Sequence, residues 1–83
     1  MNKVKYIKTD DFKIIVFSEL QQHKEFKHFN PVSAGFIVFG YTLIEGAPEV
    51  TCTCYGESES LGLKSDEVKD SRLARMQILG YNY

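Results

Sequence analysis

Four stretches of the chain combine β-branched and aromatic residues with apolar alternation, and turn residues separate them. Runs of this kind, divided by Asp-Asp at 10–11 and by Glu-Gly-Ala-Pro at 45–48, are typical of strands that pair as hairpins. The predicted strands are residues 3–9, 12–18, 33–44 and 49–61. They form two β-hairpins, one in each half of the chain.

Helix signals follow each predicted hairpin. Ser18 with Gln21 three residues later matches a capping box, and the Asn-Pro pair at 30–31 ends the helix that it starts. Ser65, followed by acidic residues, predicts a second helix that ends at Gly80. The order ββαββα predicts an α+β fold, with a four-stranded antiparallel sheet and two helices on one face.

Both faces of the central strands are apolar, over residues 12–17 and 36–43. An antiparallel sheet with one solvated face alternates instead, so we expect the face that lacks helices to be an interface. The alternative is that long side chains of neighbouring strands shield this face. The interface candidates are Ile15, Phe17, Ile37, Phe39, Tyr41, Glu57 and Glu59.

Composition limits the chain to one domain, residues 1–83, with a small core. Small chains rich in aromatic residues often complete their core with a second subunit, which favours a homo-oligomer, most simply a dimer. The net charge of −1 makes nucleic acid an unfavourable partner. No apolar run approaches the ~20 residues of a membrane span, and the first residues lack the apolar core of a signal peptide. We therefore expect a cytoplasmic protein without a membrane partner.

The Gly-x-Ser-x-Ser run at 56–60 lies one residue from the nucleophile elbow of serine hydrolases. That elbow needs a strand-to-helix turn and a later histidine, but His23 and His28 both precede the run. Glu57 and Glu59 are more typical of surface charges that protect a strand edge than of a catalytic pair. We expect a strand here and no catalytic residue, with a small enzyme using Ser58 or these glutamates as a rival hypothesis.

Cys52 and Cys54 could combine with the two histidines as metal ligands. Cys-x-Cys is not the spacing of zinc knuckles, and histidines five positions apart on a helix diverge. Two residues apart on a strand, the thiols are also too distant for a relaxed disulfide. We expect buried reduced thiols, no metal and no other cofactor.

Arg72 interrupts the apolar stripe of the last predicted helix. An arginine at such a position either packs its stem on apolar surface or binds an anion. An anion site at a subunit interface would make the protein a small-ligand or nucleotide-sequestering oligomer, which is the alternative function. The anion-binding candidates are Arg72, Arg75, Ser33, Lys27 and His28.

Three sequence blocks within residues 14–80 form a recognisable combination. They are the acidic start of the last helix, Phe29-Asn30-Pro31-x-Ser33-Ala34-Gly35-Phe36 and Gly56-x-Ser58-x-Ser60-Leu61-x-Leu63-x-Ser65. Together they resemble small proteins carried by phages and other mobile elements of bacteria, which have no established activity. The resemblance implies an accessory or counter-defence role, in which the protein binds and blocks a host protein. We therefore expect a small, non-enzymatic binding module.

Overall fold

The structure, a computed structural model, describes residues 3–81 apart from the side chains of Thr42 and Ile44. Its elements are β1 (Lys3–Thr9), β2 (Ile14–Phe17), the 3-10 helix η1 (His23–Phe29), β3 (Pro31–Ile44), β4 (Ala47–Tyr55), β5 (Glu57–Ser58), β6 (Leu63–Lys64) and the α-helix α1 (Glu67–Leu79). The predicted α+β class is confirmed, and so is the four-stranded antiparallel sheet. No helix among these residues is long and apolar enough to cross a membrane.

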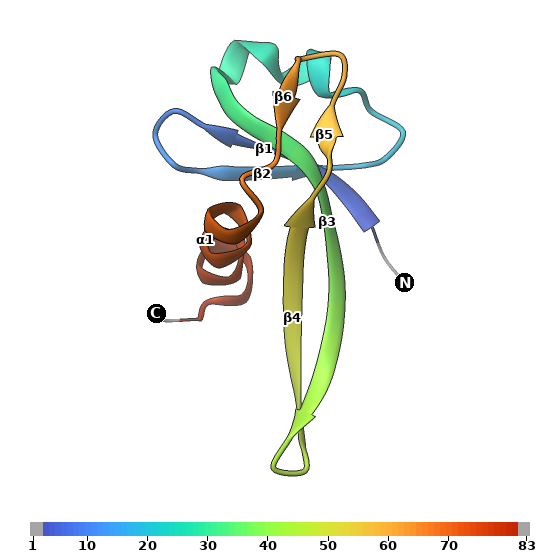
Figure 1. Ribbon diagram of the computed structural model, residues 1–83, viewed down its shortest axis with the longest axis vertical. Coiled ribbons are helices and arrows are strands. Elements are labelled where there is room, and N and C mark those ends of the chain that lie inside the picture. The colour runs from blue at the N-terminus through green and yellow to red at the C-terminus, as the bar shows by residue number, and fades with distance from the viewer. Residues whose placement is uncertain (1–2, 82–83) are drawn as a thin grey trace.

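The strands of the main sheet follow the order β2-β1-β3-β4. β3 is 14 residues long and pairs first with β1, through residues 31–38, and then with β4, through residues 36–44. The sheet therefore bends along β3, so that β1 and β2 cross the view of Figure 1 while β3 and β4 run along its long axis. The outer part of the β3–β4 hairpin extends from the body of the molecule, and we call residues 40–51 the arm.

The arm ends in a two-residue turn. Glu45 and Gly46 both have positive φ, 52° and 82°, which is the backbone geometry that matches the twist of a two-residue β-hairpin. The turn is thus shorter than the four residues predicted from the sequence, because Ala47 and Pro48 already belong to β4.

Each face of the sheet is covered by a different part of the chain. On one face α1 packs against a buried cluster, which consists of Tyr6, Ile37, Cys52, Cys54 and Ala74. On the other face lies a second cluster, in which Ile7, Phe17 and Ala34 are covered by Phe26 of η1 and by Leu61 and Leu63. The two helices therefore lie on opposite faces, in place of the single face that the sequence predicted. The apolar pattern on both faces of the central strands reflects burial within one chain, and the expectation of an uncovered face over the body of the sheet is wrong.

The second face is covered because the chain crosses over β3 after β4. A Cβ atom at Gly35 would lie 2.3 Å from the carbonyl oxygen of Tyr55, so only glycine fits this crossing. Gly56 has φ +82°, which favours glycine and turns the chain out of the main sheet. The strand predicted over 56–60 is therefore reduced to β5. Ser58 is buried as expected, but Ser60 is exposed.

Helix boundaries also differ from the predicted ones. The first helix begins at His23, because the carboxylate of Glu25 accepts a hydrogen bond from the Gln22 N–H at 2.6 Å and so replaces the predicted cap at Ser18. α1 begins one residue later than expected, after Asp66, and Gly80 ends it in the left-handed conformation as predicted.

Candidate functional site

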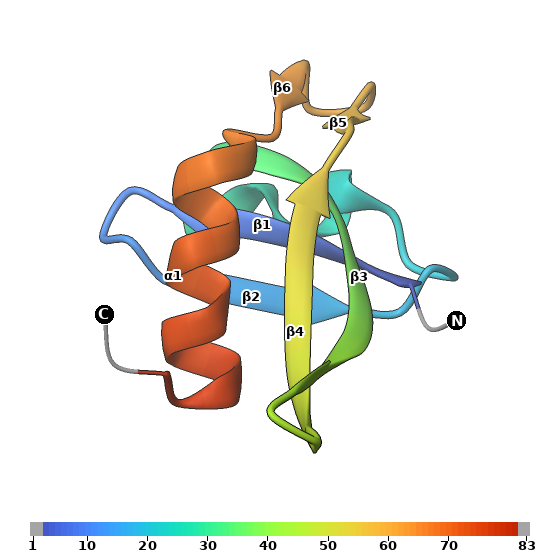
Figure 2. The same cartoon turned by 60° about the horizontal axis from the view of Figure 1, so that its bottom comes forward.

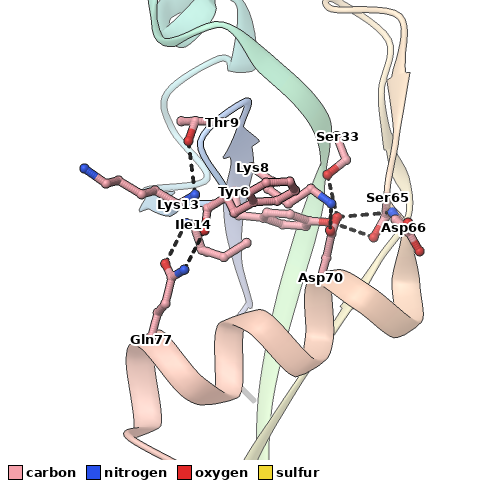
Figure 3. Close-up of polar contacts among 11 residues, drawn as sticks. Tyr6, Lys8, Thr9, Lys13, Ile14, Ser33, Ser65, Asp66, Asp70 and Gln77 are labelled. Atoms are coloured by element: carbon pink, nitrogen blue, oxygen red, sulfur yellow. Dashed lines mark hydrogen bonds and ion pairs between the residues drawn. The ribbon is translucent and has the colours of Figure 1, made fainter.

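A buried carboxylate joins α1 to the sheet (Figure 3). Asp70 has no exposed surface, and its Oδ1 lies 2.8 Å from the ammonium of Lys8 on β1. Its Oδ2 accepts hydrogen bonds from the hydroxyls of Tyr6 and Ser33, at 2.5 and 2.6 Å, and from the backbone N–H of Asp66 at 3.1 Å. One side chain of α1 thus bonds both β1 and β3.

The charges in this network are fixed by its contacts. Burial by itself would raise the pKa of Asp70, but the bonds from Lys8, Ser33 and Tyr6 outweigh it and lower that pKa. Burial and the bond to Asp70 raise the pKa of Tyr6, whose hydroxyl also lies 2.6 Å from Ser65 Oγ. The carboxylate stays ionised and the phenol stays neutral. Because these groups bond one another inside the core, we interpret the network as structural.

The outer edge of β4 is closed by side chains from α1 and the residues that follow it. Ser71 Oγ accepts from the Cys54 N–H at 2.7 Å, Arg75 Nε donates to the Cys52 carbonyl at 2.9 Å, and the Tyr81 hydroxyl donates to the Val50 carbonyl. Pro48 continues the series Cys54, Cys52 and Val50 at the same two-residue spacing, and as a proline it has no backbone N–H. These contacts leave few free backbone groups on this edge for an additional strand.

α1 also holds the opposite edge of the sheet. Gln77 accepts a hydrogen bond from the Ile14 N–H at 2.8 Å (Figure 3). Its amide nitrogen donates a second hydrogen bond to the Phe12 carbonyl at 2.6 Å. The helix therefore spans from β4 to β2, across the curved sheet, as Figure 2 shows. Both edge strands are tied to one helix.

One apolar surface extends beyond α1. Tyr41 and Leu43 are 72 % and 70 % exposed, and they stand opposite Val50 and Pro48 across the hairpin. Residues opposite each other in an antiparallel pair share a face, so we call these four residues the apolar face of the arm. It continues the same sheet face that α1 buries nearer the body, where Ile37 lies in the core. In Figure 1 the arm reaches past the end of α1.

A second exposed apolar surface lies on the outer side of α1. A hollow of about 200 Å³, which we call the α1 groove, is lined by Lys8, Phe12, Lys69, Arg72, Leu73 and Met76. Phe12 is 66 % exposed and has φ 64°, which is uncommon for a bulky residue. The lining of the groove thus combines apolar and basic side chains.

A larger hollow of about 460 Å³ lies between η1 and β5. It is lined by Lys5, Gln22, His23, Phe36, Gly56, Glu57, Glu59 and Ser60. His23 Nε2 lies 2.9 Å from the Gly35 carbonyl, and burial lowers the pKa of this imidazole, so it is neutral. Lys5 Nζ donates to the Gln21 carbonyl at 2.8 Å. The basic side chains Lys5 and His23 are thus bonded to the backbone, and the hollow shows no convergent catalytic set.

The predicted anion-binding residues do not come together. Ser33 is buried against Asp70, and Arg75 bonds the edge of β4. Lys27 and His28 belong to η1, which covers the other face of the sheet from α1. Arg72 lines the α1 groove, and Arg75 lines a separate hollow of about 300 Å³ with Thr53, Glu67, Val68 and Ser71.

The predicted interface residues divide into three groups. Phe17 and Ile37 are buried in the core of the chain, and Ile15 and Phe39 pack against the two core clusters, which leaves them little surface for a partner. Glu57 and Glu59 are exposed at the hollow beside η1. Tyr41 is the member of this set that the arm presents to solvent.

Sequence reasoning missed Asp70 and its neighbour Ser71. The signal that could have found them is their helical spacing with Ala74, which places all three on the buried side of α1. Asp70 and Ser71 are the polar members of this inward face, and each needs a partner there.

The two thiols are buried and free. Burial raises the pKa of Cys54 to about 12 and also raises that of Cys52, so both are protonated at neutral pH. Within residues 3–81 no three histidine, cysteine or acidic side chains group as metal ligands.

No protein-family model, curated protein or solved structure matches this chain. Its function is therefore inferred from its own residues and geometry.

Proposed function

We propose that this protein is a non-enzymatic binding module, and that the apolar face of the arm is its contact surface for another protein chain. The observation that carries the proposal is the exposure of Tyr41 and Leu43 on a sheet face that is core elsewhere in the molecule. Contiguous apolar surface of this kind typically marks an interaction site.

The hydrogen bonds at the edges of the sheet favour a partner that contacts a sheet face over one that adds a strand. α1 bonds backbone groups of β4 through Ser71 and Arg75, and it bonds the start of β2 through Gln77. A partner that adds a strand needs a row of free N–H and C=O groups, which these side chains occupy in part. Side chains of the arm therefore offer a more accessible surface than the edges of β4 and β2 do.

The resemblance to small phage proteins supports a counter-defence role in the cytoplasm of a bacterium, in which a host protein is bound and blocked. A homodimer is consistent with the small core and with the exposed apolar surfaces. Each of these statements is part of the proposal, and the contact with another protein chain is testable on the arm.

Photo-crosslinking from the arm tests the proposal directly. p-Benzoylphenylalanine in place of Leu43 should form adducts with one or a few defined proteins in bacterial cells. The control carries the same group in place of Leu20, which is 95 % exposed and lies outside the arm. Equal adducts from both positions, or none from position 43, would contradict the proposal.

A further inference from the structure

We propose that the arm of one copy of this chain docks in the α1 groove of a second copy, and that two copies exchange arms in this way as a symmetric dimer. The inference rests on the proposed function, because it names the occupant of the arm's apolar face. It assigns the apolar face of the arm and the α1 groove to one contact.

Charge complementarity favours this pairing. Within the arm, the charged residues are Glu45 at the turn and Glu49 on β4, and residues 40–51 include no lysine or arginine. The charged residues that line the groove are Lys8, whose charge is paired with Asp70, and the basic residues Lys69 and Arg72. An acidic arm against a basic groove favours encounter of the two and opposes pairing of arm with arm or groove with groove.

Phe12 provides a second argument. Its positive φ would suit asparagine or glycine at lower cost, and 66 % of its surface is exposed. Folding of a single chain therefore gives little reason for an aromatic side chain here. A tyrosine from the arm of a second copy would pack against Phe12 and explain its aromatic side chain, since aromatic pairs gain stability beyond their buried area.

The contact requires a second copy. Ser71 and Arg75 face β4 of their own chain, whereas Lys69 and Met76 line the groove, and on an α-helix these two pairs lie on different sides. The groove thus faces away from the chain's own arm.

Exchange of two arms about a twofold axis also makes every contact twice. Stable interfaces bury roughly 1,200–2,000 Å² in total, so each arm-in-groove contact needs to supply only about half of that area.

A charge exchange tests the inference. Variant one carries Glu45→Lys and Glu49→Lys, and variant two carries Lys69→Glu and Arg72→Glu. We expect the unaltered protein to sediment at twice its 9.5 kDa chain mass at micromolar concentration. Each variant alone should dimerise at least ~10-fold more weakly, because like charges then meet at both contacts. An equimolar mixture of the two variants should recover the dimer, since opposite charges meet again.

The matched control is Glu57→Lys with Glu59→Lys, which makes the same charge change outside both proposed surfaces and should leave the dimer intact. Circular dichroism verifies that every variant is folded. A monomeric unaltered protein, variants that still dimerise, or a mixture that stays monomeric would each overturn the inference.

The outcome also separates this inference from the proposed function. If position 43 crosslinks to a different protein while the chain stays monomeric, the arm is a contact surface and only the second-copy assignment fails. If position 43 forms no specific adduct, both fail.

Discussion

The ammonium of Lys8 lies 2.8 Å from Oδ1 of Asp70, in a site where the carboxylate has no contact with solvent. Oδ1 has no other hydrogen-bond partner among the described residues, so Lys8 alone balances that side of the carboxylate. This pair joins α1 to β1 and so positions both the groove and the helix that closes the edge of β4.

Removal of one partner should be costly. We expect Asp70→Ala to lower the free energy of unfolding by about 3–5 kcal/mol, because it leaves the Lys8 charge buried and unpaired. The measurement is urea denaturation followed by circular dichroism. Lys8→Met combined with Asp70→Leu should recover a large part of the loss. A single-variant loss below about 1 kcal/mol would show that the pair is dispensable.

Acid should destabilise the protein in two stages. Burial lowers the pKa of His23 from its ordinary 6.5. The unfolded chain therefore protonates this imidazole at a higher pH than the folded chain does, so the free energy of unfolding falls as the pH drops below about 6.5. The pKa of Asp70 is also lowered, despite its burial, so its contribution is present above 3.8 and is lost as the pH falls below that value. His23→Gln should flatten the unfolding free energy between pH 7 and 5. An unchanged slope in that variant would exclude His23 as the cause.

Cys52 and Cys54 should be unreactive in the folded protein. Both are buried, and the pKa of Cys54 is raised to about 12, so little thiolate is present. Ellman's reagent should label neither thiol in native buffer and both in urea. Rapid native labelling would contradict their burial.

Phe12→Asn should have opposite effects on folding and on association. Asparagine tolerates the positive φ, so we expect an equal or higher free energy of unfolding, by up to about 1 kcal/mol, at a concentration where the chain is monomeric. The same change should weaken the dimer, because it removes an aromatic contact from the groove. A variant that is less stable yet dimerises normally would show that Phe12 serves the fold.

Local patterns predicted the elements better than their arrangement. Alternation located β1 and the long hairpin, and Gly80 ended α1 as expected. The side on which each helix lies depends on contacts between distant segments, and no local signal indicated that Leu61 and Leu63 would cover the second face. The cap at Ser18 failed because Gln22 and Glu25 formed a competing one.

The candidate site was predicted only in part. Among the predicted interface residues Tyr41 is exposed, whereas Phe17 and Ile37 have the same apolar character and are buried in the core. The distinction depends on which segment covers each residue, which is a tertiary property: Ile37 packs in the cluster with α1 and Phe17 in the cluster with Phe26, whereas the arm reaches past α1. The role of Arg75 likewise depends on its distance to the Cys52 carbonyl.

The most direct test of the central claim is sedimentation equilibrium of the Tyr41→Thr, Leu43→Thr double variant beside the unaltered protein. Threonine keeps the preference for a strand and removes the apolar surface, so the arm should remain folded. Leu20→Thr is the matched control, because it removes a leucine outside the arm that is even more exposed than Leu43, at 95 % against 70 %. We predict a dimer for the unaltered protein and for the control, and a chain mass near 9.5 kDa for the double variant. A double variant that dimerises as tightly as the unaltered protein would contradict a contact through the arm.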